Sequence, residues 1–192
     1  MIWNIPNGLT MLRILLIPVF VAIFYAQPVL VTEHTANQLA TFVFALAAIT
    51  DWLDGYLARV LNQTSAFGAF LDPVADKLMV AAALVMLIEF ERVGALVAFI
   101  IIGREIAISA LREWMAGIGE GSNVAVAFIG KVKTAAQMIA ILFLLYNDPI
   151  NTPFGMVDIK YIGLISIIIA AFLTLLSMAY YLKAAWPRMR AR

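Results

Sequence analysis

The sequence predicts an all-α integral membrane protein, a bundle of six transmembrane helices with both termini in the cytoplasm. Of the 192 residues, 64% are hydrophobic and 13% are charged, whereas soluble domains are about half apolar and about a quarter charged. The apolar residues fall into six long runs, and a helix needs roughly 20 apolar residues to cross a bilayer. Lysines and arginines gather on one side of the six crossings, which marks the cytoplasmic side.

Each predicted helix begins or ends where polar residues or helix breakers interrupt the apolar run. The first run lacks the basic start and small-residue cleavage site of a signal peptide, so we interpret it as a retained helix. The connectors are Gln27-Pro28, Thr32 to Thr35, Asn62 to Ser65, Gly117 to Asn123 and Asn147 to Pro153. The predicted helices are Leu9–Ala26, Gln38–Val60, Phe67–Phe90, Val93–Trp114, Phe128–Tyr146 and Ile159–Leu182.

The whole chain, residues 1–192, is expected to form a single membrane domain, because six crossings leave little sequence for a soluble one. Residues 1 to about 8 are expected to lie at the membrane surface, with Ile2, Trp3 and Ile5 dipping into lipid. Cysteine is absent from the sequence, which excludes disulfides, thiolate metal sites and cysteine nucleophiles. The net charge of +1 gives no indication of a nucleic-acid partner, and we expect none.

The basic residues indicate the orientation of the helices. With the N-terminus inside, only Arg92 and Lys160 face the outside, and the opposite orientation would invert this ratio. The other basic residues then lie toward the cytoplasm: Arg13, Arg59, Lys77, Arg104, Arg112, Lys131, Lys133, Lys183, Arg188, Arg190 and Arg192.

Four aspartates interrupt the second and third predicted helices: Asp51, Asp54, Asp72 and Asp76. A carboxylate at the centre of a membrane helix costs about 2.5–3.5 kcal/mol, so four of them need water, cations or bound metal. The members of each pair are three or four residues apart and share a helix face. The turn at residues 62–65 predicts an antiparallel hairpin that brings both pairs to a similar depth near the cytoplasmic end. Four converging carboxylates suit Mg²⁺ or Mn²⁺.

Small residues accompany the aspartates. Gly55 and Ala58 lie on the aspartate face of the second helix, and Gly68 precedes the third-helix aspartates by one turn, so a ligand can approach the backbone closely. Arg59 is suited to clamping a phosphate. Two other interpretations stay open here. The small residues can serve close helix packing, and the aspartates can form buried ion pairs with Arg59 and Lys77.

The pattern resembles the signature of the CDP-alcohol phosphatidyltransferases. All eight signature positions are present within 26 residues: Asp51, Asp54, Gly55, Ala58, Arg59, Gly68, Asp72 and Asp76. The similarity is greatest to one branch of that family, the bacterial phosphatidylglycerophosphate synthases. The stretches that carry this second similarity are Ile5–Thr10, Phe67–Lys77, Arg104–Ile106, Ser109–Trp114 and Gly130–Thr134.

The resemblance implies a six-helix, homodimeric membrane enzyme in the bacterial inner membrane, with its active site facing the cytoplasm. The implied reaction transfers a phosphatidyl group from CDP-diacylglycerol to sn-glycerol 3-phosphate and gives phosphatidylglycerol phosphate and CMP. By this resemblance two divalent ions, Mg²⁺ or Mn²⁺, bind the four aspartates, and Asp76 is also the general base. The residues expected to hold the nucleotide part of the donor are Asn7, Thr10, Asp54, Gly55, Ala58, Arg59 and Gly68.

An acceptor with a phosphate group needs fixed cations. Glu105, Ser109 and Arg112 fall on one face of the fourth predicted helix, and Arg112 is the first candidate to bind that phosphate. Lys131 and Lys133 are further candidates, with lipid head groups as their alternative partners. Arg104 is the last candidate, and its alternative is a structural ion pair with Glu105. For Asn7 and Thr10, helix capping is the alternative to nucleotide binding, and Thr10 and Arg13 can also line the cavity.

Other functions explain fewer of these features. The same chemistry with another acceptor, such as an inositol phosphate, serine or phosphatidylglycerol, fits the signature equally well. A small cation transporter would use the aspartates as an ion site, but the inverted repeats and interrupted helices of many transporters are not apparent. A scaffold protein leaves the aspartates unexplained.

Overall fold

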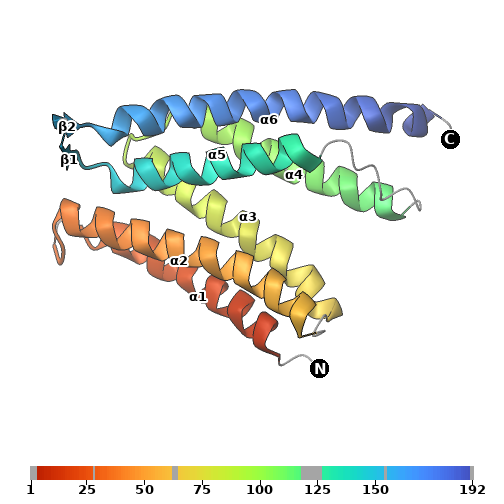
Figure 1. The fold of residues 1–192 in the computed structure, drawn as a ribbon, viewed down its shortest axis with the longest axis horizontal. Helices are drawn as coiled ribbons and strands as arrows, with labels where there is room; N and C mark the ends of the chain where they lie inside the picture. The colour runs from red at the N-terminus through yellow and green to blue at the C-terminus, as the bar shows by residue number, and fades with distance from the viewer. Residues whose placement is uncertain (1–3, 28, 62–64, 118–126, 154, 191–192) are drawn as a thin grey trace.

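The computed structural model describes residues 4–27, 29–61, 65–117, 127–153 and 155–190. Within them the chain forms helices and one small antiparallel hairpin (Figure 1). The helices are α1 (Ile5–Tyr25), α2 (Glu33–Val60), α3 (Ala66–Glu89), α4 (Ala95–Gly117), α5 (Ala127–Tyr146) and α6 (Ile159–Arg190). The hairpin joins β1 (Ile150–Thr152) to β2 (Gly155–Val157), with Asn151 opposite Met156.

Every predicted helix is present, but several ends were predicted wrongly. Helix α1 begins at Ile5, since the Asn4 side chain caps it by accepting a hydrogen bond from the Asn7 backbone N–H at 2.9 Å. Residues 5–8, expected in a separate surface segment, are therefore the first turn of α1. Helix α2 begins at Glu33 because Thr32 Oγ1 accepts from the Thr35 N–H at 3.3 Å. The β1–β2 hairpin lies where only a connector was predicted.

The helices form two groups (Figure 1). Helix α1 packs against both α2 and α3, whereas α6 packs against both α5 and α4. The groups meet near the β1–β2 hairpin and diverge toward the end of the molecule where both termini lie. Helices α2 and α3 contact each other much less than either contacts α1, so the two helices that carry the aspartates are joined mainly through α1.

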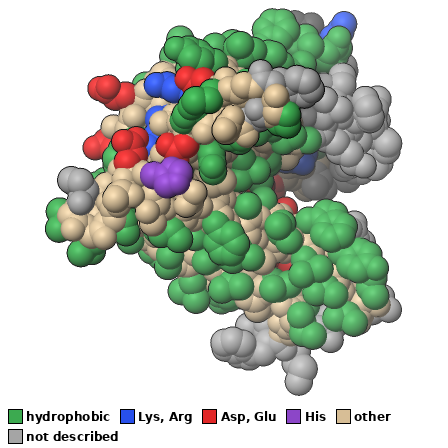
Figure 2. All heavy atoms as spheres, turned by 60° about the vertical axis from the view of Figure 1, so that its left-hand side comes forward, with side chains coloured by type: hydrophobic (Ala, Val, Ile, Leu, Met, Phe, Trp, Pro, Cys, Tyr) green, Lys and Arg blue, Asp and Glu red, His purple; other side chains and the backbone are tan. Residues whose placement is uncertain are grey.

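The apolar core sits where the two groups meet. Phe20 and Phe24 of α1 are fully buried, with ring centroids 5.4 Å apart in an edge-to-face arrangement. Leu84 and Leu87 of α3 and Leu144 of α5 complete the centre of this cluster. Many large apolar side chains lie on the outside instead, and hydrophobic atoms cover much of the face in Figure 2. Apolar surface of this extent fits a protein surrounded by lipid.

Three helices in the described part of the chain are long and apolar enough to cross a membrane. They are Ile5–Tyr25, Glu33–Ala58 and Ile159–Lys183. The described apolar part of α5, Thr134–Tyr146, is shorter. Helices α3 and α4 carry the charged residues of the candidate site, which lower their apolar character. The chain is thus a helical membrane bundle.

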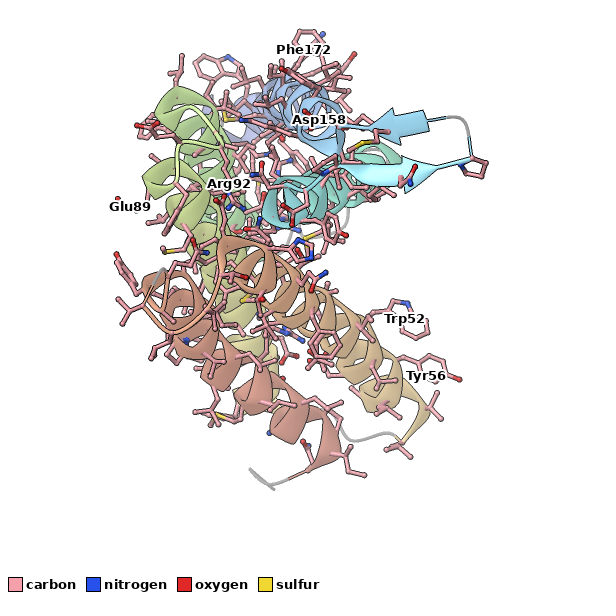
Figure 3. The ribbon with its side chains drawn as sticks, turned by 90° about the vertical axis from the view of Figure 1, so that its left-hand side faces the viewer. Trp52, Tyr56, Glu89, Arg92, Asp158 and Phe172 are labelled. Atoms are coloured by element: carbon pink, nitrogen blue, oxygen red, sulfur yellow. The ribbon has the colours of Figure 1, made fainter. Side chains whose placement is uncertain are left out.

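Arg92 is a buried arginine at the end of the molecule that carries the β1–β2 hairpin (Figure 3). Arg92, which lies between α3 and α4, donates to Asn37 Oδ1 at 2.6 Å and to the Leu145 carbonyl at 2.9 Å. Its burial lowers the pKa of the Arg92 guanidinium. Figure 3 views this end and labels Arg92 there, while Trp52 and Tyr56 point outward from α2. These hydrogen bonds connect the start of α2 to the end of α5, at the end of the molecule where the two helix groups meet.

Candidate active site

Three of the four signature aspartates are joined through α1. Arg13 of α1 is 1% exposed and forms ion pairs with Asp51 Oδ1 through Nη1 at 2.7 Å and with Asp54 Oδ2 through Nη2 at 2.5 Å. The fully buried hydroxyl of Thr10 donates to Asp72 Oδ1 at 2.6 Å and lies 3.4 Å from Asp54 Oδ2. Helix α1 therefore bridges the acids of α2 and α3.

The convergence of the aspartates was expected, but its cause was not. We expected α2 and α3 to bring their acids together as a hairpin and named Arg59 and Lys77 as competing ion-pair partners. The ion pairs described for these acids are with Arg13, and the side chain of Arg59 lies outside the described part of the structure. A sequence signal for the role of α1 does exist. Asn7, Thr10 and Arg13 recur every three residues and mark one polar face on an apolar helix.

Asp76 lines a cavity between α3 and α4. The cavity has a volume of about 580 Å³, and Ser109 and Arg112 line it from the α4 side. Asp76 lies one helical turn beyond Asp72 on α3, so the cavity adjoins the acid cluster. The buried Ser109 Oγ has no hydrogen-bond partner among the described residues, which leaves a polar atom for a ligand. The described residues around the cavity are Ala69, Phe70, Pro73, Val74, Asp76, Lys77, Glu105, Ser109, Arg112 and Glu113.

Arg104 serves a different contact. Its guanidinium donates to Ser177 Oγ of α6 at 2.7 Å and to Glu105 Oε2 at 3.2 Å, and its Cζ lies over the Tyr181 ring, 5.9 Å from the ring centroid. It is 6% exposed and is not among the described residues that line the cavity. Arg104 thus joins α4 to α6. The side chains of Lys131 and Lys133, the other expected cations, lie outside the described part of α5.

The two signature glycines differ in their surroundings. A Cβ atom added to Gly55 would meet no atom within 4 Å, so its backbone is open to a ligand. A Cβ atom on Gly68 would lie 2.5 Å from Asn7 Oδ1. Asn7 also exchanges hydrogen bonds with Ser65, at 3.0 Å from Asn7 Nδ2 to Ser65 Oγ and 3.1 Å from Ser65 Oγ to Asn7 Oδ1. The space beside Gly68 is therefore filled by the Asn7 side chain and is not open to a ligand. This contact holds the first turn of α1 against the start of α3.

The acid cluster fits a hard divalent cation by the chemistry of its donors. Carboxylate oxygens are preferred ligands of Mg²⁺ and Mn²⁺, and the side chain of Asp51 is 42% exposed and open to an incoming ion. As the side chains stand, no group of three or more acidic or histidine residues in the described regions is arranged around one metal position. Arg13 and Thr10 already contact the oxygens of Asp51, Asp54 and Asp72.

Comparisons with known proteins agree with the signature. A family model described as CDP-alcohol phosphatidyltransferase matches residues 3–183. An Escherichia coli K12 protein named CDP-diacylglycerol–glycerol-3-phosphate 3-phosphatidyltransferase is 49% identical over 185 residues, which is 95% of this chain and 95% of the relative. A protein of the same name from Pseudomonas fluorescens is 50% identical over 193 residues, covering 97% of this chain and 92% of the relative.

Proposed function

Since the chain belongs to the CDP-alcohol phosphatidyltransferase family, we propose that it transfers the phosphatidyl group of CDP-diacylglycerol to sn-glycerol 3-phosphate. The products are phosphatidylglycerol phosphate and CMP, and the reaction belongs to phospholipid biosynthesis. Relatives that share about half of their residues with this chain over nearly its whole length carry the name of this reaction. The observation that carries the proposal is the cavity in which Asp76 and Arg112 lie beside the acid cluster.

The acid cluster is the proposed site of two divalent ions, Mg²⁺ or Mn²⁺. Their ligands are Asp51, Asp54, Asp72 and Asp76. When bound, such ions stabilise the charge that builds up on the diphosphate and on the departing CMP. The open backbone at Gly55, together with Ala58 and Arg59, is proposed to hold the nucleotide part of the donor. Asn7, Thr10 and Gly68 contribute by holding α1 against α3, since their described contacts are with the acids and with each other.

Asp76 is the proposed general base. An alcohol is a weak nucleophile, and a carboxylate at the cavity wall can take its proton as it attacks. The acceptor oxygen forms a bond to the phosphorus that carries the diacylglycerol, and the bond from that phosphorus to the CMP oxygen breaks. The proton moves from the acceptor hydroxyl to the Asp76 carboxylate.

Arg112 is the proposed binding residue for the acceptor phosphate. It lines the same cavity as Asp76, and a guanidinium offers two parallel donors to a phosphate. Ser109, one turn before Arg112, provides the hydroxyl that lacks a described partner. Lys131 and Lys133 remain proposed contributors from α5. Glu105 and Glu113 line the same cavity.

The proposed topology has six crossings, both termini in the cytoplasm and the active site facing the cytoplasm, in the inner membrane of a bacterium. Both termini lie at one end of the molecule, as an even number of crossings requires (Figure 1). The acid cluster lies toward that end of α1, and Arg92 lies at the other. In this orientation Arg92 faces the outside and most other basic residues lie toward the cytoplasm, as expected from the sequence. A homodimer is part of the proposal.

An acceptor panel tests the proposed reaction. The purified chain in detergent is given CDP-diacylglycerol with sn-glycerol 3-phosphate, an inositol phosphate, serine or phosphatidylglycerol, each with and without a chelator. We expect CMP release that requires glycerol 3-phosphate and stops on chelation. Preference for another acceptor would contradict the substrate assignment. Release that survives chelation would contradict the metal site, and metal flux into vesicles without CMP release would favour a transporter.

A further inference from the structure

Arg13 is the positively charged residue in the described ion pairs of Asp51 and Asp54. The side chain is buried in α1, and its two terminal nitrogens lie 2.7 Å and 2.5 Å from oxygens of Asp51 and Asp54. The positive charge of the guanidinium offsets part of the negative charge of the two carboxylates.

A divalent ion bound to Asp51 and Asp54 would need the same oxygens that Arg13 now contacts. A guanidinium and a metal ion repel each other at such distances, and the repulsion is strong where water is scarce. Thr10 also engages Asp72 Oδ1 at 2.6 Å, so α1 contacts three of the four proposed ligands.

We propose that Arg13 is a built-in counter-ion that competes with the divalent metal for Asp51 and Asp54 and gives way when metal binds together with a diphosphate. The proposal rests on the metal site argued under Proposed function and adds the order of events. The diphosphate offers the displaced guanidinium a new partner, since arginine binds phosphate oxygens bidentately. Metal and nucleotide then bind cooperatively, and each raises the affinity for the other by the same factor.

This arrangement has a physical advantage for a protein in a membrane. Without a counter-ion, the acids would repel one another, and Asp54, which is 3% exposed, would be a buried unpaired charge that destabilises the helices around it. With Arg13 in place, α1, α2 and α3 stay together before any substrate arrives. Arg13 is thus a positioning residue whose removal has two opposite effects. It weakens the fold without metal and strengthens metal binding without nucleotide.

The test measures Mn²⁺ binding by electron paramagnetic resonance on the purified full chain in detergent, without and with CDP. We expect Arg13→Gln to bind Mn²⁺ at least about tenfold more tightly than the native chain without CDP, a difference of about 1.4 kcal/mol. Adding CDP should tighten Mn²⁺ binding more in the native chain than in the variant. Arg13→Lys keeps the charge and should stay close to the native affinity.

Arg92→Gln is the matched control, because Arg92 is also a buried, paired arginine but lies at the other end of the bundle. It should lower the melting temperature without changing Mn²⁺ affinity. The Arg13→Gln variant is purified in the presence of Mn²⁺. Removing the Mn²⁺ with a chelator should unfold the variant at a temperature at which the native chain stays folded. A variant that does not fold even with Mn²⁺ would overturn the proposal.

The remaining outcomes separate this proposal from the metal site itself. Equal or weaker Mn²⁺ binding by Arg13→Gln, with binding retained in the native chain, overturns the role of Arg13 and leaves the metal site standing. Failure of both proteins to bind Mn²⁺, with CDP as well as without it, overturns the metal site and the inference together.

Discussion

At the scale of single residues, the site separates acids that touch α1 from one acid that faces a cavity. Asp51, Asp54 and Asp72 are engaged by Arg13 and Thr10, whereas Asp76 lines the space shared with Arg112. The first three are thereby held in place for ligand binding. Asp76 is the carboxylate best placed to meet an acceptor hydroxyl.

Replacing Asp76 by Asn tests the general base. The amide cannot accept the proton and provides a poorer metal ligand, so we expect turnover to fall by roughly 10²–10⁴-fold. The melting temperature should change little, because Asn has nearly the same size. Asp158→Asn is the control, since this exposed residue lies at the start of α6 at the hairpin end. Turnover within a few fold of native in Asp76→Asn would refute the role.

Replacing Arg112 by Ala tests the acceptor pocket. Loss of the guanidinium would remove the proposed charge-assisted contact to the acceptor phosphate, and we expect the KM for glycerol 3-phosphate to rise about tenfold. The KM for CDP-diacylglycerol should change much less. Steady-state kinetics with each substrate varied in turn measures both constants. Arg104→Ala is the comparison, because Arg104 contacts α6. Equal changes in both constants for Arg112→Ala would contradict the assignment.

At the scale of elements, α1 is the helix that connects the acids of α2 with those of α3. The sequence pattern predicted that α2 and α3 carry the acids, but the helix that joins them was not assigned this task. Its polar residues at positions 7, 10 and 13 face inward, while most of the helix is apolar. The sequence analysis named Asn7 and Thr10 as candidate nucleotide ligands and Thr10 and Arg13 as residues that can line the cavity, but the contacts of Thr10 and Arg13 with the acids of α2 and α3 were not predicted.

Replacing Gly68 by Ala tests the contact between α1 and α3. The added methyl group would collide with Asn7 Oδ1, which lies 2.5 Å from its position, and α1 would have to shift. We expect a loss of about 1–3 kcal/mol in stability, as for other overpacked sites. Thermal unfolding in detergent provides the measurement. Gly55→Ala, at a position with open space, should leave stability nearly unchanged.

A second substitution separates this contact from nucleotide binding. In an Asn7→Ala background the collision disappears, so Gly68→Ala should then cost much less stability than it does in the native chain. The same cost in both backgrounds would show that Gly68 is needed for some reason other than the approach of Asn7.

At the scale of the whole molecule, long apolar runs were sufficient to predict six helices, and the distances of the acids from the turn at residues 62–65 predicted that both pairs lie at a similar depth. Helix ends were less accurate, because local caps such as Asn4 and Thr32 decide them and polar residues beside an apolar run look like connectors. The packing of α1 against both α2 and α3 could not be predicted from the same pattern. It depends on contacts between residues about 40 to 60 positions apart, including those of Arg13 with Asp54 and of Thr10 with Asp72.

The divergence of the two helix groups also follows from the distribution of side chains over the whole chain. Apolar residues and the Arg92 network hold the hairpin end together, whereas charged residues line the space between α3 and α4. A single buried core near one end thus leaves room for ligands near the other. We therefore expect substrates and metal to bind between the two helix groups, at the end of the molecule where the termini lie.

Anomalous X-ray scattering from Mn²⁺ in crystals grown with CDP would locate the metal ions on the chain. We expect two Mn²⁺ peaks about 3.5–4 Å apart, within ligand distance of Asp51, Asp54, Asp72 and Asp76, with the Arg13 guanidinium turned away from the carboxylates. Peaks at any other place on the chain, or an acid cluster still paired with Arg13 and free of manganese while CDP is bound, would contradict this prediction.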